Sequence, residues 1–209
     1  MQGMNQYTRN PPLDAESLDP DPMRELERWI DAAREAGMLE PTAMTLATAG
    51  ADGIPAARIV LFKGLHENCP TFYTNYASRK GRMLSENPHA ALVFWWDQME
   101  RQVRIEGRVE KLPREISEAY FASRPRESQL SATVSRQSRP VASRTELDAR
   151  MDEAAERFGD GAIPCPEQWG GYRLLPARVE FWQGRHGRAH DRLLYEQASS
   201  GWRILRLEP

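Results

Sequence analysis

Lysine is scarce in this chain, and several features that would assign a function quickly are absent. Only three of the 28 basic residues are lysines, namely Lys63, Lys80 and Lys111. The basic residues are offset by 30 acidic ones to a net charge of −2, which argues against a polycation that binds nucleic acid. The sequence contains no Gly-x-Gly-x-x-Gly fingerprint, no P-loop and no Gly-x-Ser-x-Gly elbow. Dinucleotide binding on a Rossmann fold, ATP chemistry and serine hydrolysis therefore lose support.

Cysteine usage and the first residues bear on location. Cys69 and Cys165 lack the spacing of a metal or redox pair. Residues 1–5 lack the charged and apolar regions of a secretory signal, and no apolar run in the chain approaches membrane-spanning length. We therefore expect reduced thiols and a cytoplasmic location.

Short apolar stretches separated by turns, with helices inserted between them, predict an α+β fold built on an antiparallel barrel or sandwich. The polar, Pro-rich residues 1–20 are expected to form a flexible arm, and residues 21–209 a single domain. Strands are expected at 43–48, 58–63, 71–75, 90–96, 101–109, 171–175, 178–183, 192–195 and 202–207. Helices are expected at 22–36, 78–86, 113–120 and 143–158. The first helix would be capped by Asp21 and bury one face, made of Met23, Leu26, Trp29, Ile30 and Ala33.

Four cations surround two of these expected strands. Arg58 and Lys63 flank the apolar run Ile59-Val60-Leu61-Phe62, which predicts a strand buried on both faces. After the next strand, Ser78-Arg79-Lys80 places two cations at the start of a helix, where free N–H groups and the helix dipole favour an anion. The stretch therefore predicts a site for a phosphate-bearing ligand.

Three later segments also carry polar groups in unusual combinations. Tyr120, Arg124 and Ser128 are spaced i, i+4, i+8, but Pro125 forbids one uninterrupted helix, so a helix end is expected. Their donors suit a phosphate, although a solvated helix end is the alternative. The segment Ser135-Arg136-Gln137-Ser138 offers an amide and a hydroxyl, and a plain loop is its simpler interpretation.

The third segment joins Phe181-Trp182-Gln183-Gly184 to Arg188-Ala189-His190-Asp191-Arg192. Trp and Arg stack on planar rings, and His can donate or accept a proton near neutrality, so a heterocycle is a suitable ligand. An ion-pair network on a strand is the alternative. A zinc pair of His186 and His190 is disfavoured, since no cysteine or third histidine lies nearby in the sequence.

Taken together, these segments resemble the pyridoxamine 5′-phosphate oxidase family, whose FMN-dependent members make pyridoxal 5′-phosphate. The resemblance also includes Phe72-Tyr73-Thr74-Asn75, Glu100-Arg101-Gln102-Val103 and Trp169-Gly170-Gly171, and it runs in order from about residue 21 to the C-terminal Arg206-Leu207-Glu208-Pro209. It implies an FMN-binding split β-barrel, Greek-key-like with peripheral helices, that forms a homodimer with FMN at the subunit interface. No metal is implied.

The resemblance also implies roles for individual residues. FMN would be bound by Arg58, Ile59, Val60, Leu61, Phe62, Lys63, Tyr73, Thr74, Arg79, Lys80, Gln102, Gln137, Ser138, Trp182 and Arg192, some of them from the partner subunit. The substrate would be bound by Lys63, Tyr120, Arg124, Ser128, Arg188, His190 and Tyr7, with Arg188 and His190 as the catalytic pair beside the ring. In the arm only Tyr7 matches the family pattern, so closure of the arm over the substrate does not follow.

The implied activity is oxidation of pyridoxamine and pyridoxine 5′-phosphates to pyridoxal 5′-phosphate by hydride transfer to the flavin. Oxygen would be the electron acceptor and give hydrogen peroxide, and the amine would release ammonia. Two alternatives stay open: a related FMN oxidase of phenazine biosynthesis, and a non-catalytic protein that binds flavin or pyridoxal phosphate.

Overall fold

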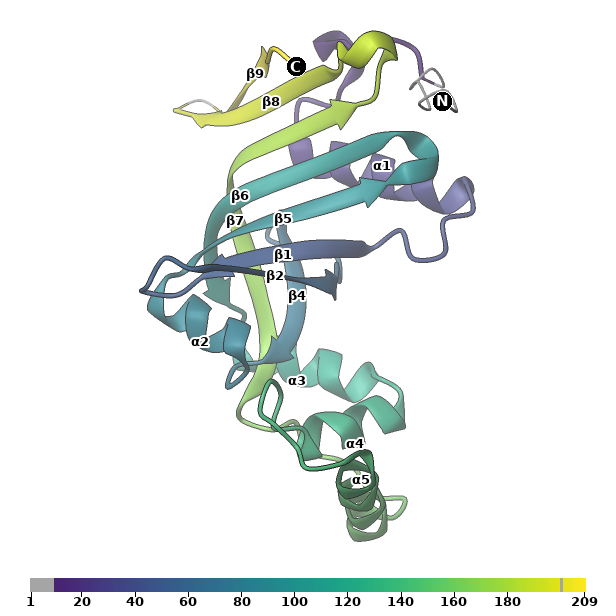
Figure 1. Cartoon of the computed structure of the whole chain (residues 1–209), viewed down its shortest axis with the longest axis vertical. Coiled ribbons are helices and arrows are strands. Elements are labelled where there is room, and N and C mark those ends of the chain that lie inside the picture. Colours follow the sequence, from purple (N-terminus) through teal and green to yellow (C-terminus); the bar gives the residue numbers. More distant parts are fainter. Residues whose placement is uncertain (1–9, 200) are drawn as a thin grey trace.

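One strongly curved antiparallel sheet of nine strands organises residues 10–199 and 201–209, the part of the chain that the computed structural model describes (Figure 1). Its strands are β1 (Ala43–Ala49), β2 (Pro55–Leu61), β3 (Leu65–His66), β4 (Cys69–Asn75), β5 (His89–Trp96), β6 (Arg101–Lys111), β7 (Trp169–Gln183), β8 (Asp191–Ala198) and β9 (Gly201–Arg206). The α-helices are α1 (Pro22–Glu35), α2 (Arg79–Glu86), α3 (Arg114–Ser123), α4 (Arg126–Val134) and α5 (Arg144–Phe158). Within this part of the chain, no helix has both the length and the apolar character needed to cross a membrane. The predicted α+β antiparallel class is confirmed.

The sheet closes on itself into a barrel. Its strand order is β2-β1-β5-β6-β7-β4-β3. The chain just after β2 meets β4, where the N–H of Lys63 donates to the carbonyl oxygen of Thr71 at 3.0 Å, while β2 itself is paired, among the described strands, only with β1. Strand β7 pairs with β4 at its start, with β6 from Tyr172 onward and with β8 through its second half. In Figure 1, β7 accordingly runs from the end that carries α3–α5 to the end that carries β8 and β9.

The continuity of β7 corrects the expectation of two strands at 171–175 and 178–183. The strand passes through Pro176, opposite a register shift between Glu106 and Gly107 on β6. A bulge relaxes the hydrogen-bond ladder, so a residue without an N–H is tolerated there. At Gly107 a Cβ would lie 1.9 Å from the carbonyl oxygen of Leu175, so the two backbones can approach only because this residue is glycine.

Helix α1 covers the core as predicted. The Asp21 side chain accepts a hydrogen bond from the Met23 N–H at 2.9 Å, and Pro22 occupies the first turn, where its missing N–H has no cost. All five residues of the expected apolar face are buried. Trp29 packs edge-on against Phe181 with ring centroids 5.0 Å apart, which joins the helix to the middle of the sheet.

Residues 10–20 differ from the flexible arm expected for residues 1–20. Leu13 and Leu18 are buried, the Leu13 N–H donates to Asp191 at 3.0 Å, and the Tyr195 hydroxyl donates to the Asp19 carbonyl at 2.7 Å. Two leucines and these hydrogen bonds are enough to hold the segment against the C-terminal strands. Residues 1–9 lie outside the described part of the chain, and the assignment of 21–209 as one domain stays a prediction.

Strand β2 corrects a second expectation, because it is an edge strand and not buried on both faces. Its residues alternate between exposed and half-buried as far as Val60, and Ile59 is 64 % exposed. Ile59 is aligned with Thr45 of β1, and Thr45 with Val93 of β5, so it belongs to the outward face of the sheet. Trp95, two residues along β5 on the same face, is 46 % exposed. One chain thus leaves apolar side chains uncovered on this face.

Helices α3, α4 and α5 form a separate apolar cluster beside the first residues of β7 (Figure 1). The cluster is built on Phe121, Leu130 and Ala154, together with Trp169 at the start of β7. Helix α5 begins as expected, with the Ser143 hydroxyl accepting from the Glu146 N–H at 3.1 Å. Helix α4 was not among the expected helices; it follows α3 directly, with Pro125 as its N-cap residue.

Candidate active site

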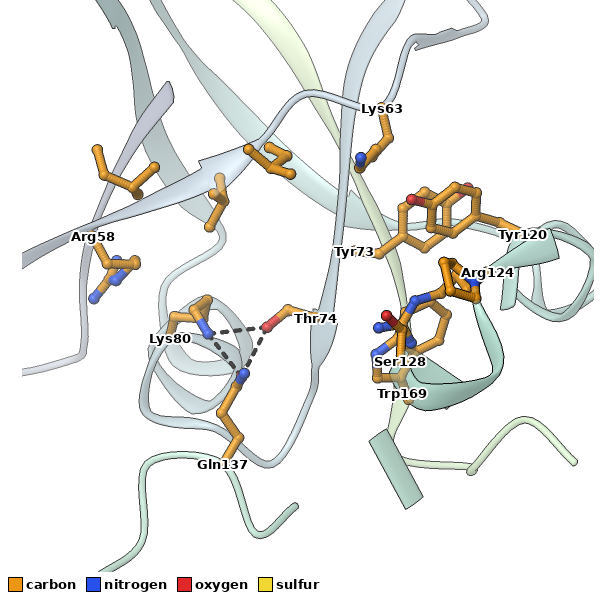
Figure 2. Close-up of a pocket in the computed structure, with 14 residues that line it drawn as sticks. Arg58, Lys63, Tyr73, Thr74, Lys80, Tyr120, Arg124, Ser128, Gln137 and Trp169 are labelled. Carbon is orange, nitrogen blue, oxygen red and sulfur yellow. Dashed lines mark hydrogen bonds between the residues drawn. The ribbon is translucent and has the colours of Figure 1, made fainter. Parts of the chain in front are cut away.

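A cavity of about 470 Å³ lies where β2, β4 and the start of α2 face the α3–α4 turn (Figure 2). It is lined by Arg58, Ile59, Val60, Leu61, Lys63, Tyr73, Thr74, Lys80, Tyr120, Arg124, Pro125, Ser128, Gln137 and Trp169. None of these lining residues is acidic. The cavity therefore presents cations, hydroxyls and an amide to a ligand, a donor set that suits an anion.

Arg58 and Lys80 form the cationic centre of one side of the cavity. Arg58 is held by hydrogen bonds from Nη1 to the Leu46 carbonyl at 2.9 Å and to the Thr48 hydroxyl at 2.8 Å. Burial, with a smaller contribution from the positive charge of Arg58, lowers the pKa of the Lys80 ammonium to about 8. Two cations held together in a partly buried place are stabilised by an anion between them.

Thr74 and Gln137 orient the Lys80 side chain. Lys80 Nζ donates to the Thr74 hydroxyl at 3.0 Å and to Gln137 Oε1 at 2.8 Å, and the Thr74 hydroxyl donates to the same oxygen at 3.0 Å, as the dashed lines of Figure 2 mark. Lys80 is the second residue of α2, whose N-cap Ser78 accepts from the Gly81 N–H at 3.2 Å. The predicted start of the helix is thus confirmed.

Aromatic rings and a second pair of cations form the other side. The Tyr73 and Tyr120 rings stack with centroids 3.9 Å apart, and the Arg124 guanidinium lies 4.7 Å from the Trp169 ring centroid. Figure 2 shows the Lys63 side chain pointing toward the cavity above these rings. Tyr120 and Ser128 lie on different helices, and the turn at Arg124 brings them to one cavity.

A second group of expected site residues lies together elsewhere on the chain. Gln102 on β6 is aligned with Trp182 on β7, and Trp182 with Arg192 on β8, so the three form a row across the outward face of the sheet. The rings of Trp182 and His190 are 4.6 Å apart. Arg192 Nε donates to the buried carboxylate of Glu180 at 2.9 Å. None of these residues lines the cavity, so one chain does not bring the two groups together.

The turn between β7 and β8 favours one neutral tautomer of His190. The backbone N–H of Arg185 donates to His190 Nδ1 at 3.2 Å, so Nδ1 acts as the acceptor and the neutral ring carries its proton on Nε2. Burial, and then the charge of Arg188, lowers the pKa of His190, which favours the same neutral form. A neutral imidazole of this kind can donate from Nε2 to a polar substituent.

Four other expected site residues fall outside the cavity lining. The Phe62 side chain is buried in the core, edge-on to Phe94 at 6.0 Å between centroids, so at most its backbone could contact a ligand. Burial, and to a smaller extent the charge of nearby Arg79, lowers the pKa of Arg58. Ser138 follows Gln137 in the loop after α4. Tyr7 lies outside the described residues.

Trp169 and Pro125 line the cavity although neither was proposed as a site residue. Trp169 belongs to the Trp169-Gly170-Gly171 segment, which contributed only to the family resemblance; its two adjacent glycines could have indicated that a side chain packs closely against this strand. At Gly171 a Cβ would lie 2.8 Å from Tyr73 Cε1 and 2.5 Å from Leu112 Cδ1. The Tyr73 ring can therefore occupy this position only opposite a glycine.

Replacing Gly171 by Ala is expected to lower the free energy of unfolding by about 1–3 kcal/mol, because the added methyl overpacks the contact with Tyr73 and Leu112. Urea denaturation measures the change. Gly161→Ala is the matched control, since its Cβ would meet a single atom, the Phe158 carbonyl oxygen at 3.1 Å. Equal stability of Gly171→Ala and the wild type would show that the Tyr73 ring has room to move.

The fold and the cavity define an antiparallel barrel protein with a cationic cavity whose donors suit an anion. A family model described as pyridoxamine 5′-phosphate oxidase matches residues 30–158, and one described as the pyridoxine 5′-phosphate oxidase C-terminal dimerisation region matches residues 169–209. The chain belongs to the pyridoxamine 5′-phosphate oxidase family, a family of oxidoreductases.

Relatives and solved structures agree with this assignment. The chain is 52 % identical over 204 residues to a pyridoxine/pyridoxamine 5′-phosphate oxidase of Rubrobacter xylanophilus, covering 98 % of this chain and 94 % of the relative. It is 54 % identical over 200 residues to one of Burkholderia cenocepacia, covering 94 % and 93 %. Among solved structures, PhzG from Burkholderia lata, in complex with tetrahydrophenazine-1-carboxylic acid, superposes with a TM-score of 0.87 at 31 % identity, covering 93 % of this chain and 95 % of that one. A pyridoxamine 5′-phosphate oxidase-related, FMN-binding protein of Nostoc punctiforme has the same fold, with a TM-score of 0.71 at 20 % identity over 86 % of this chain and 95 % of that one.

Proposed function

We propose that this protein binds FMN and oxidises pyridoxamine 5′-phosphate and pyridoxine 5′-phosphate to pyridoxal 5′-phosphate. Oxygen is reduced to hydrogen peroxide, and the amine substrate also consumes water and releases ammonia. The observation that carries this proposal is the division of the cavity into two cationic sides, with Arg58 and Lys80 on one and Lys63 and Arg124 on the other (Figure 2). Two such sides suit two phosphate groups, one from the cofactor and one from the substrate.

The cavity fits a flavin phosphate on its Lys80 side. The volume of about 470 Å³ lies in the range of small-molecule sites. Arg58, Lys80 and the free N–H groups at the start of α2 would hold the phosphate, and Thr74 and Gln137 keep the ammonium in place. When bound, FMN supplies the acceptor for the hydride that leaves the substrate.

The other side fits the substrate phosphate. Arg124 Nη1 is buried and has no hydrogen-bond partner among the described residues, which is costly unless a ligand supplies an acceptor. Lys63, Tyr120 and Ser128 line the same part of the cavity and would complete the phosphate contacts. Anchoring the phosphate at four points would fix the carbon to be oxidised at one place, which accelerates the reaction by proximity.

A second copy of the chain would complete the site. Gln102, Trp182 and Arg192 face outward in a row, and the exposed Ile59 and Trp95 lie on the same face of the sheet. Exposed apolar side chains of this kind are typical of a subunit interface. The match to a C-terminal dimerisation region covers residues 169–209, which include two of the three outward-facing residues. We therefore propose a homodimer in which the cavity of one subunit receives this row from the other.

Arg188 and His190 would then orient the ring of the substrate. His190, neutral and protonated on Nε2, can donate to a polar group of the ring or of its substituent, and Arg188 adds a positive charge beside it. In this proposal neither residue acts as an obligatory base.

An FMN oxidase of phenazine biosynthesis is the second candidate, because the likeness to PhzG extends over 93 % of this chain. The discriminating feature is the set Lys63, Tyr120, Arg124 and Ser128, four donors that a substrate without a phosphate would leave unpaired.

The test is an absorbance spectrum of the purified protein followed by peroxide release. We expect an oxidised-flavin spectrum and peroxide from pyridoxamine and pyridoxine 5′-phosphates, with far less from unphosphorylated pyridoxamine. A colourless protein that does not take up added FMN would refute the proposal. Turnover of a reduced phenazine precursor in preference to both phosphates would favour the second candidate.

The affinity for FMN is expected to fall as pH rises through 8. Lys80 has a lowered pKa of about 8, so its positive charge is present below that pH and is lost above it. If only the charged form of Lys80 binds the phosphate tightly, the loss of its proton makes the Kd for FMN about tenfold higher at pH 9 than at pH 7. Quenching of FMN fluorescence on binding, measured between pH 7 and 9, gives the Kd for FMN as a function of pH.

Lys80→Arg is the matched control for this prediction, because a guanidinium keeps its charge throughout the range. Its Kd should change much less between pH 7 and 9, even if the altered geometry weakens binding at every pH. A wild-type profile as flat as that of Lys80→Arg would contradict the role of the ammonium.

A further inference from the structure

The Arg124 guanidinium is held by aromatic rings and by no carboxylate. Its central carbon lies 4.7 Å from the Trp169 ring centroid and 5.7 Å from that of Phe121. No ion pair to Arg124 occurs among the described residues, and its Nη1 is buried without a hydrogen-bond partner. Arg192 is held in the contrasting way, by two hydrogen bonds to the Glu180 carboxylate.

These two ways of holding an arginine have different consequences for an anionic ligand. A carboxylate takes up the N–H donors in the plane of the guanidinium and neutralises its charge. An aromatic ring attracts the guanidinium through its face and leaves the in-plane donors open. The ring therefore positions Arg124 without competing with the phosphate that we propose it binds.

Trp169 is itself firmly fixed. Trp169 is 6 % exposed. Its backbone N–H donates to the Pro166 carbonyl oxygen at 3.0 Å, and its backbone carbonyl oxygen accepts from Arg114 Nη1 at 3.0 Å. It stands at the first position of β7, aligned with Asn75 of β4. The indole is thus buried on a hydrogen-bonded backbone and can support the Arg124 side chain.

Trp169 also continues the stack of tyrosines. Its ring is nearly parallel to that of Tyr73, at 16° and 5.5 Å between centroids, and to that of Tyr120, at 7° and 6.3 Å. Tyr73 comes from β4 and Tyr120 from α3, so the stack joins the strand on the proposed flavin side to the helix on the proposed substrate side.

We propose that Trp169 is a positioning residue of the substrate-phosphate site: its ring face holds the Arg124 guanidinium edge-on to the cavity and keeps the N–H donors free for the phosphate. This inference rests on the proposed function, because it requires that a phosphate occupy the Arg124 side. Trp169 acts through Arg124 and need not touch the substrate.

The test compares Trp169→Leu and Trp169→Met with Trp169→Phe in the FMN-loaded enzyme. Calorimetric titration with pyridoxal 5′-phosphate should give a Kd about 3- to 30-fold higher for the Leu and Met variants, which lose the cation–π contact. Trp169→Phe keeps a ring and should stay within about threefold of the wild type. The KM for pyridoxamine 5′-phosphate should follow the Kd, while the KM for unphosphorylated pyridoxamine stays unchanged. Two non-aromatic variants are included so that a folding defect in one leaves the comparison intact.

Trp202→Leu is the matched control, since this half-buried indole on β9 packs against Tyr195 on β8 and does not line the cavity. It should leave the Kd for pyridoxal 5′-phosphate unchanged. An equal loss in Trp202→Leu and Trp169→Leu would mean that a general loss of packing, and not the position of Arg124, weakens binding.

A double-mutant cycle separates a role through Arg124 from a direct one. In an Arg124→Ala background, Trp169→Leu should have no further effect on the Kd, because the group it positions is gone. Additive losses would overturn the proposal. If the wild-type enzyme binds FMN and turns over pyridoxamine 5′-phosphate but Trp169→Leu and Trp169→Met bind pyridoxal 5′-phosphate normally, the inference fails and the proposed function stands. If the wild type itself neither binds nor turns over the phosphates, the proposed function fails first.

Discussion

Replacing Arg124 by Ala is expected to lower kcat/KM for pyridoxamine 5′-phosphate by about 10- to 150-fold, the value of a buried hydrogen bond to a charged group. Arg124 is half-buried and lines the cavity, and its Nη1 is buried without a partner among the described residues, so the phosphate of the proposed substrate would supply the acceptor that it lacks. Unphosphorylated pyridoxamine makes no such contact, and its kcat/KM should stay the same. Steady-state peroxide release with the two substrates measures both values.

Arg126→Ala is the matched control, because Arg126 lies two residues away and donates to the Gly161 carbonyl at 2.9 Å outside the cavity. It should leave kcat/KM for both substrates unchanged. An equal loss for the phosphorylated and unphosphorylated substrates in Arg124→Ala would place the arginine elsewhere in the mechanism.

The parts of the site that depend on local sequence were predictable. A serine followed by two cations indicates a helix start, and Ser78 does cap α2 with Lys80 in its first turn. The anion-binding character of this stretch follows from the same local rule. Asp21 and Pro22 specify the start of α1 in the same way.

The sheet was harder to predict because its pairing is non-local. Pro176 indicates a break, and the strand continues through it because the pairing with β6, about 70 residues earlier in the chain, shifts register between Glu106 and Gly107 and leaves Ala177 of β7 as an extra residue. Likewise the apolar run Ile59-Val60-Leu61-Phe62 suggests burial on both faces, while the fold places it at an edge. What covers an edge strand is set by other parts of the assembly, and a single sequence does not contain that information.

The prediction of the proposed substrate side of the cavity rested on a local argument that was incomplete. A spacing of i, i+4, i+8 would place Tyr120, Arg124 and Ser128 on one face of a helix, but Pro125 rules out that helix. In the structure two helices meet at Arg124, and the turn between them brings the residues together instead. Trp169 was missed because its contact with Arg124 joins residues 45 positions apart, and a tryptophan at the start of a strand is ordinarily a core residue.

Two inactive variants of this chain are expected to restore activity when they are combined. The first, Arg58→Ala with Lys80→Ala, removes two of the four cations of the cavity, those on the proposed flavin side. The second, Gln102→Ala with Trp182→Leu, alters the outward row of the sheet. Each homodimer would lack one half of both sites. A mixed dimer would hold one site with an intact cavity and an intact row, and one with neither.

Random assembly of the two variants in a closed two-fold dimer makes half of the dimers mixed, so about a quarter of the wild-type FMN content and peroxide release should return. Co-expression of the two chains, followed by an absorbance spectrum and the peroxide assay, measures the recovery. Co-expression of the first variant with Arg124→Ala is the control for peroxide release, because both changes lie in the cavity and no dimer of these chains holds an intact one. No recovery, or full activity of the Gln102→Ala, Trp182→Leu variant alone, would show that one chain carries the whole site. Recovery near a quarter would mean that the outward row and the cavity are halves of one site, which explains why a single chain holds these two groups of residues apart.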